Sequence, residues 1–235
     1  MTILNPYVQR VASGSPTSDK WTLSASTKQG NVLIAAITGG AGIVPTALTD
    51  SKGNTWVKAT ATGANRSIAV FVAVMKTALL SGDQITANVN GSNPMAVVDE
   101  YTTLMGTYPL DRANSTNNAS NVTSLASGTT GQLIRANQLI YTAVALNTPT
   151  PTAVVPTGYT DRGSATDGVV YIQGAELIVN SNAALNPTWN WTTATNGSVA
   201  VATFMLANPP LPGNYQQVSA DDNGNGVLSV GEKIR

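Results

Sequence analysis

The segment that decides the fold is residues 31–38, Asn31-Val32-Leu33-Ile34-Ala35-Ala36-Ile37-Thr38, which is closed by Gly39-Gly40. It is too short and too rich in β-branched residues for a long helix. An almost unbroken apolar run of this length is typical of a strand that is covered on both faces. The segment therefore predicts a β-strand in the interior of the molecule, with a turn at the two glycines.

Similar apolar runs recur along the chain, at 67–75, 95–101, 138–144, 169–172, 175–179 and 198–206. Turn-forming residues separate them, at 50–54, 81–83, 90–94 and 196–197. Many short strands with turns between them indicate an antiparallel sandwich or barrel. We therefore expect an all-β fold, with a single helical turn near residues 77–80 and no long amphipathic helix.

The composition divides the chain into three parts. Residues 1–19 are weakly patterned and predict an N-terminal arm, whereas 20–207 hold the apolar runs and predict one β-sandwich. Residues 208–235 open with a proline-rich linker, which predicts a stiff spacer before a short tail. Within the body, 114–130 consist almost purely of Asn, Ser, Thr, Ala and Gly, which predicts a long surface loop or a second arm.

The chain of 235 residues contains no histidine and no cysteine. This excludes a Ser-His-Asp triad, a histidine-ligated metal centre, a thiolate nucleophile, a zinc knuckle and a disulfide. The sequence therefore favours a structural or binding protein over an enzyme.

Charge is scarce. Charged residues make up 10% of the chain, against about 25% in an average protein, and 12 basic residues balance 12 acidic ones. No basic stripe suited to nucleic acid is visible. Because a neutral, weakly charged surface protects poorly against association, we expect the chain to live in an assembly.

The sequence also bears on location. No stretch approaches the ~18 uninterrupted apolar residues of a membrane span. Residues 1–6 lack the charged and apolar regions of a signal peptide, so we expect a protein that is made and kept in a cytoplasm or leaves it by lysis.

The sharpest motif lies in the tail. Residues 221–232 read DDNGNGVLSVGE and satisfy every position of the EF-hand pattern D-x-[DN]-x-[DN]-G-x5-E. The motif predicts Ca²⁺ as a cofactor, with Gly226 making the sharp turn. Its expected ligands are Asp221, Asn223, Asn225, Val227 through its carbonyl, Ser229 and Glu232. The alternative is an Asn/Gly-rich tail whose spacing is accidental.

A resemblance to known proteins rests on residues 48–56, Leu48-Thr49-Asp50-Ser51-Lys52-Gly53-Asn54-Thr55-Trp56. They are similar to the DSxGNTW hairpin of jelly-roll domains in bacterial surface proteins and phage structural proteins. The flanking runs 31–38 and 68–75, the Ser-Gly-Asp at 81–83, the Asp-Glu-Tyr at 99–101 and the segment 108–111 also fit. The resemblance spans about residues 30–206. It implies an often multimeric jelly-roll sandwich and carries over no catalytic residue. The tail likewise resembles one dockerin repeat or an isolated calcium loop of secreted proteins.

Aromatic side chains offer a glycan-binding alternative. Residues 188–192 read Thr-Trp-Asn-Trp-Thr, which places the indoles of Trp189 and Trp191 on one face of a strand. Both are candidates for stacking on sugar rings, and packing in a core is the competing explanation.

Acidic residues offer a second alternative, a glycan-cleaving enzyme. Glu100 and Glu176, with Asp99 nearby, are the candidate pair of carboxyl groups. The competing explanation is that each faces solvent or pairs with a lone arginine such as Arg112 or Arg162.

Taken together, these features favour a non-enzymatic virion structural protein of a bacteriophage, either a capsid decoration or cement protein or a head or tail fibre component. The expected partners are further copies of the chain, with a trimer as the analogous form, and other virion proteins such as a major capsid protein. Neither nucleic acid nor membrane is expected as a partner. The alternative is a carbohydrate-binding module or surface adhesin.

Overall fold

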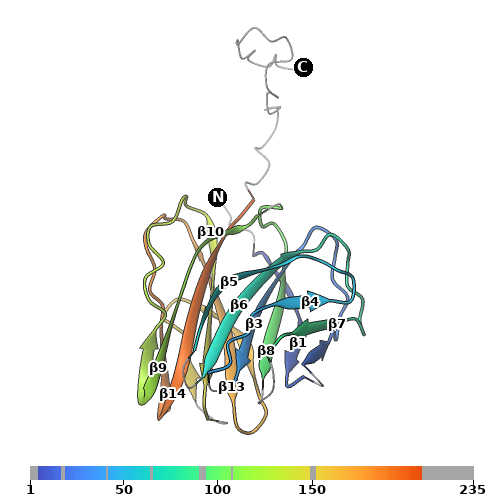
Figure 1. Cartoon of the computed structure of the whole chain (residues 1–235). Coiled ribbons are helices and arrows are strands. Elements are labelled where there is room, and N and C mark those ends of the chain that lie inside the picture. Colours follow the sequence, from blue (N-terminus) through green and yellow to red (C-terminus); the bar gives the residue numbers. More distant parts are fainter. Residues whose placement is uncertain are drawn as a thin grey trace, which may run out of the picture.

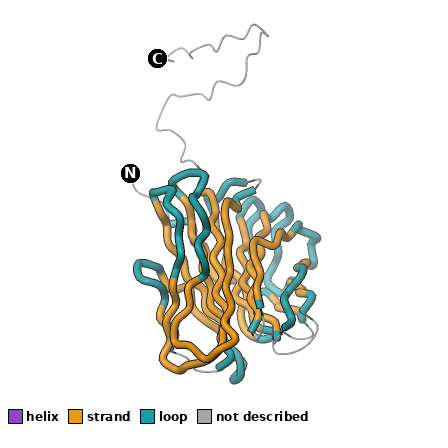
Figure 2. Tube along the Cα trace, turned by 60° about the vertical axis from the view of Figure 1, so that its left-hand side comes forward, coloured by secondary structure: helices purple, strands orange, loops and turns teal. Residues whose placement is uncertain are grey.

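The computed structural model describes residues 5–16, 19–40, 42–63, 66–89, 94–106, 108–148 and 152–207. Within them the chain forms fourteen strands and no helix (Figure 2). All strand pairings among these residues are antiparallel. The prediction of an all-β antiparallel sandwich is confirmed. The strands are β1 (Tyr7–Gly14), β2 (Lys20–Thr22), β3 (Val32–Gly39), β4 (Leu48–Asp50), β5 (Trp56–Thr62), β6 (Ser67–Val74), β7 (Gln84–Ala87), β8 (Met95–Tyr101), β9 (Leu110–Ala126), β10 (Gln138–Leu146), β11 (Ala153–Val154), β12 (Thr160–Thr166), β13 (Tyr171–Val179) and β14 (Thr188–Met205). No helix in the described part is long and apolar enough to cross a bilayer.

Two large sheets pack face to face (Figure 1). The first has the strand order β1-β8-β3-β6-β5, and the second has the order β9-β14-β10-β13-β12. Alternate side chains of the facing strands, such as Ile34, Val97, Tyr141 and Phe204, form one shared core between the sheets. This period-2 alternation follows from strand geometry, because successive side chains point to opposite faces.

A small sheet, β2-β7-β4, covers the outer face of the first large sheet. Its residues Trp21, Leu48 and Ile85 pack with Leu33 and Phe71 of the large sheet. Every residue of β3 is therefore buried, and the prediction of a strand covered on both faces is confirmed.

The outer face of the second large sheet is covered in the same manner. The first residues of β14 pair with β11 on one side and with the end of β9 on the other. Trp189 and Trp191 project from this cover onto Val144 and Val199 of the sheet. The predicted alternation of residues 188–192 is confirmed, since both indoles share one face.

The two halves of the chain have the same topology. We call residues 7–101 the first unit and 110–205 the second unit. If the strands of the first unit are numbered one to eight, its sheets have the orders 1-8-3-6-5 and 2-7-4. The second unit repeats both orders, with β9 serving as strands one and two and β14 as strands seven and eight. Apart from strands five and six, which are neighbours in the large sheet, successive strands alternate between a large and a small sheet, much as in a jelly roll.

Backbone contacts between the units are reciprocal. Leu104, just after the first unit, forms an antiparallel bridge with Leu206, just after the second. The Met105 N–H donates to the Met205 carbonyl (2.9 Å), and the Ala207 N–H donates to the Thr103 carbonyl (2.7 Å). These two bonds are the ordinary pattern of an antiparallel bridge, and here the bridge joins the residues that directly follow the two units.

The same correspondence appears inside the units. In the first unit the Thr27 N–H donates to the Leu79 carbonyl (2.8 Å), and the Leu79 N–H donates to Thr27 Oγ1 (2.9 Å). In the second unit Thr130 and Leu185 make the same two bonds (2.9 and 3.1 Å). In both units these bonds tie the connection between the second and third strands to the connection between the sixth and seventh.

Four local predictions are wrong. Most of 114–130, expected as a loop or arm, is strand β9, because it pairs with β14 and its polar side chains bond across the sandwich edge. Thr60 Oγ1 lies 2.8 Å from Ser115 Oγ, and Asn117 Nδ2 donates to Thr62 Oγ1 (2.9 Å). The turn expected at 196–197 lies within β14, and 77–80 form no helical turn. Tyr7–Gly14, assigned to an arm, is an edge strand paired with β8.

Candidate functional site

The predicted calcium loop lies outside the described residues. All six expected ligands, Asp221, Asn223, Asn225, Val227, Ser229 and Glu232, belong to this tail, so Ca²⁺ binding stays a prediction from the sequence. In the described ranges, the structure brings together no cluster of three or more acidic side chains suited to a metal ion.

The candidate catalytic pair Glu100 and Glu176 does not converge. Residues of β8 alternate, so Glu100 shares the outer face of the first sheet with Val98, whereas Glu176 faces the inner core, where it interacts with Tyr101. Glu100 is fully buried and accepts hydrogen bonds from the Lys28 N–H (2.8 Å) and from two side-chain amides, those of Asn31 (2.8 Å) and Gln9 (2.7 Å). A glycosidase pair needs both carboxyl groups at one bond, so these two glutamates cannot form one.

Glu176 pairs with Arg162, which confirms the competing explanation for this residue. The Arg162 guanidinium also lies over the ring of Tyr7, 3.9 Å from its centroid. Since Tyr7 belongs to β1 and Arg162 to β12, this cation–π contact closes the sandwich edge between the two units.

Asp99 is fully buried beside this pair. It forms a bidentate ion pair with Arg10, with Nε to Oδ1 at 2.9 Å and Nη2 to Oδ2 at 3.1 Å. The hydroxyl of Tyr141, from the second unit, donates to Oδ2 (3.3 Å). Burial raises the pKa of Asp99 above its usual range, while Arg10 and Tyr141 oppose that shift and Glu176 adds to it.

These contacts make one buried polar cluster, composed of Tyr7, Arg10, Asp99, Tyr101, Tyr141, Arg162 and Glu176. Burial raises the pKa of Tyr101 and of Tyr141 well above the usual value, so both hydroxyls stay protonated. Gly174 makes room for one of them, because a Cβ there would lie 2.6 Å from the Tyr141 hydroxyl. Each ion pair lies within one unit, and the tyrosines join the units, through the Tyr141–Asp99 hydrogen bond and the Arg162–Tyr7 cation–π contact, which is a structural role.

Trp189 and Trp191 are not available to a glycan. Trp189 is fully buried and its indole N–H donates to Thr142 Oγ1 (3.0 Å). Trp191 is 4% exposed and donates to the Val122 carbonyl (2.7 Å). The prediction that they stack on sugar rings is wrong, because the cover strands turn both indoles onto the second sheet and not towards solvent.

The motif at 50–56 is a structural connection organised by Asp50. Asp50 Oδ1 accepts the N–H groups of Lys52 (2.9 Å) and Asn54 (3.2 Å), and Oδ2 accepts the indole N–H of Trp56 (2.9 Å). Gly53 adopts φ = +71°, which favours glycine. The resemblance implied a hairpin, but the segment is not one. It leads from β4 in the small sheet to β5 in the large sheet.

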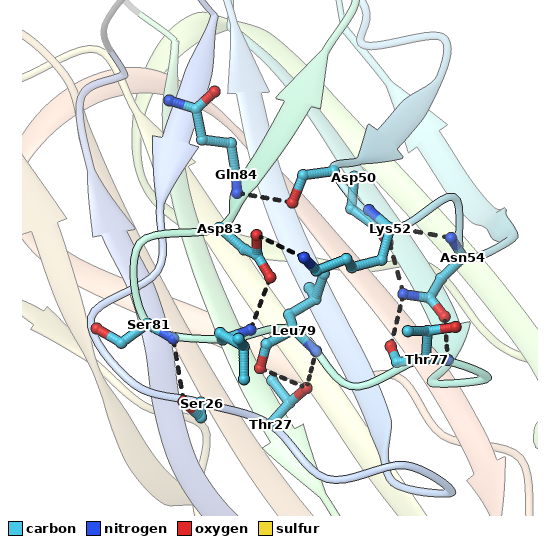
Figure 3. Close-up of polar contacts among 12 residues, drawn as sticks. Ser26, Thr27, Asp50, Lys52, Asn54, Thr77, Leu79, Ser81, Asp83 and Gln84 are labelled. Carbon is cyan, nitrogen blue, oxygen red and sulfur yellow. Dashed lines mark hydrogen bonds and ion pairs between the residues drawn. The ribbon is translucent and has the colours of Figure 1, made fainter.

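Side chains of this connection also fasten the neighbouring connection 75–83 (Figure 3). Asn54 Nδ2 donates to the Thr77 carbonyl (3.0 Å) while the Thr77 N–H donates to Asn54 Oδ1 (2.9 Å). Lys52 Nζ lies 3.4 Å from Asp83 Oδ1. The polar groups of Asp50, Lys52, Asn54 and Trp56 thus all bond to partners within the first unit.

Replacing Asp50 by alanine is expected to cost about 2 kcal/mol of folding free energy, because four donors from Lys52, Asn54 and Trp56 lose a charged acceptor. Urea unfolding of the variant measures this loss. Asp50→Asn, which keeps one acceptor oxygen, should recover part of it. Equal stability of Asp50→Ala and the parent protein would show that the motif has no structural role.

One end of the sandwich exposes apolar side chains. Met105 is 37% exposed, Tyr108 55% and Ile134 65%. The hydrogen bonds of Met205 to Met105 and Pro109, and of Arg135 to Leu206, bring their two loops to the end of β14. We call these three residues the end patch. Clustered exposed apolar groups of this kind mark interaction surfaces.

Comparison of the chain with protein-family models, with curated proteins and with solved structures finds no match. The similarity of residues 48–56 to jelly-roll domains of phage and surface proteins therefore stays a prediction drawn from the motif itself.

Sequence reasoning missed the end patch. Met105 and Tyr108 lie in one loop and Ile134 in another, and only the fold brings these two loops to the same end of β14. No periodicity marks such a surface, because its members come from loops.

Proposed function

We propose that the chain is a non-enzymatic virion structural protein, of the capsid decoration or fibre kind, which assembles with further copies of itself or with a capsid protein through the end patch. The observation that carries this proposal is the exposure of Met105, Tyr108 and Ile134 in two loops that meet at one end of β14. Burying such side chains between subunits removes apolar surface from water and favours association.

The charge of the protein supports the proposal. The net charge is zero and charged residues are 10% of the chain, so little electrostatic repulsion opposes contact between copies. The described carboxylates that had suggested catalysis are engaged in structural bonds: Asp99 with Arg10, Glu100 with backbone and amide donors, and Glu176 with Arg162. These pairings support a scaffold better than a glycan-cleaving enzyme.

The position of the tail gives calcium a place in the proposal. Residues 208–235 follow directly after Ala207, whose N–H bonds to Thr103 beside the end patch. A tail that binds Ca²⁺ through Asp221 and Glu232 would therefore be tethered next to the interface. Since a ligand stabilises whichever state binds it, calcium would favour an assembly that uses the ordered tail.

The test is the double variant Tyr108→Glu/Ile134→Glu, studied by sedimentation equilibrium. We expect the parent protein to form a multimer and the variant to be monomeric, because two buried carboxylates in an apolar interface are costly.

The matched control is Val169→Glu, since Val169 is 50% exposed near the opposite end, just before Tyr171, which pairs with Leu146 at the far end of β10. The control should keep the parent mass. A variant that stays multimeric while circular dichroism shows it folded would overturn the role of the end patch.

A further inference from the structure

The two units share a topology but differ in how two of their connections are bonded to each other. In the first unit the connection 51–55, between the fourth and fifth strands, is fastened to the connection 75–83, between the sixth and seventh. The fastening consists of the Asn54–Thr77 bonds and the Lys52–Asp83 ion pair, as Figure 3 shows. In the first unit, polar groups of the chain itself thus bridge the two connections.

In the second unit the two corresponding connections are 155–159 and 180–187. Among the described residues of these connections, no hydrogen bond and no ion pair joins one to the other. A groove of about 410 Å³ lies between them, within the usual range of small-ligand sites. With the same topology, the two connections are thus bonded to each other in the first unit and separated by an open groove in the second.

The lining of this groove is neutral and mixed. Tyr159, Leu177 and Leu185 are partly buried and give it apolar surface, while Thr157, Asn186 and Asn190 are exposed and bring hydroxyl and amide groups. No residue that lines the groove is charged. Burial raises the pKa of Tyr159 to about 12, so its hydroxyl remains a neutral donor at physiological pH.

This combination suits a neutral carbohydrate. A pyranose ring has an apolar C–H face that packs on an aromatic or aliphatic side chain, and a rim of hydroxyls that bond to amides and hydroxyls. An acidic or phosphorylated ligand would need a cationic partner, and the groove provides none.

We propose that the groove between 155–159 and 185–190 binds a neutral carbohydrate, with Tyr159 as the contact for the sugar ring and Thr157, Asn186 and Asn190 as hydrogen-bonding partners. The site is distinct from the buried Trp189 and Trp191. It does not depend on the end patch, so it stands or falls separately from the proposed assembly.

The test is an NMR titration of the ¹⁵N-labelled full chain with three neutral trisaccharides: maltotriose, cellotriose and the trimer of N-acetylglucosamine. A trimer of galacturonic acid is the charged comparison. We expect at least one neutral sugar to shift amide signals of 156–159 and 185–190, and the acidic trimer to bind at least tenfold more weakly.

Two variants localise the binding. Thr157→Arg places a long side chain at the exposed rim and should reduce affinity at least tenfold. Thr22→Arg makes the same change at an exposed position of β2, in the small sheet of the first unit, and should leave affinity unchanged.

Three results would overturn the proposal. The first is the absence of shifts with all three neutral sugars. The second is shifts that Thr157→Arg leaves intact, and the third is tighter binding of the acidic trimer. Because Thr157 is exposed and outside the core, the variant is expected to fold, and its amide spectrum without sugar verifies this.

Discussion

Arg10→Met is expected to lose about 3–5 kcal/mol of folding free energy at neutral pH, because it leaves the Asp99 carboxylate buried without its counter-charge. Methionine retains the apolar stem of the arginine, so the loss reports the charge. The bidentate geometry and the complete burial of Asp99 are the reasons for this large expected loss.

The pH dependence of that variant has a definite sign. Burial already raises the pKa of Asp99, and removing Arg10 raises it further. A carboxyl whose pKa is raised on folding favours the native state below its unfolded pKa, about 4, and loses that contribution as pH rises towards the folded value. The deficit of Arg10→Met should therefore be smaller at pH 4 than at pH 7.

A double variant separates charge from packing. Arg10→Met/Asp99→Leu replaces the ion pair by apolar groups and should be more stable than Arg10→Met alone. Urea unfolding of the parent protein and the three variants, Asp99→Leu included, completes the cycle. An Arg10→Met protein as stable as the parent would contradict the structural role of the cluster.

Trp189→Ala is expected to lose about 3–5 kcal/mol, the usual cost of removing a large buried aromatic side chain. The indole fills the space between the cover strands and the second sheet. Its removal also takes away the N–H that donates to Thr142 Oγ1. Denaturant unfolding followed by circular dichroism measures the loss.

The matched control is Thr192→Ala, on the same strand and exposed, which should stay within about 0.5 kcal/mol of the parent. The expected result distinguishes a core residue from a sugar-binding one, since an exposed tryptophan can be removed with little loss of stability. A Trp189→Ala protein of parental stability would place the indole at the surface and restore the original glycan hypothesis.

The strands of the interior were predictable because their composition carries the signal. Residues 31–38 and 138–144 are apolar on both faces, and the structure buries both faces. Strand β9 was not predictable, because its Asn, Ser and Thr residues resemble a loop in isolation. It is a strand because β14 provides a long antiparallel partner, a tertiary contact that local composition does not encode.

The repeated topology of the two units was hidden for a related reason. The first unit breaks its outer strands into β1 with β2 and β7 with β8, whereas the second keeps them continuous as β9 and β14. Strand order, and not residue identity, relates the halves, so reading along the chain gave a single sandwich.

The candidate site likewise contains some features that the sequence predicts and others that depend on the fold. The pairing of Glu176 with Arg162 was one of the alternatives that the sequence left open, and the structure selects it. Glu100 and Glu176 lie on different faces because of the strand register. A shift of one residue would move either side chain to the other face of its sheet. The end patch and the groove both arise where loops from distant parts of the chain meet, so neither leaves a local pattern.

The measurement that tests the proposed function most directly is the mass of the full chain in solution by light scattering, first with calcium and then with excess EDTA. Assembly through the end patch predicts a multimer, and a calcium-bound tail beside that patch predicts that EDTA weakens it. A multimer that EDTA leaves unchanged would retain the end patch and remove calcium from the proposal. A monomer under both conditions would contradict self-assembly.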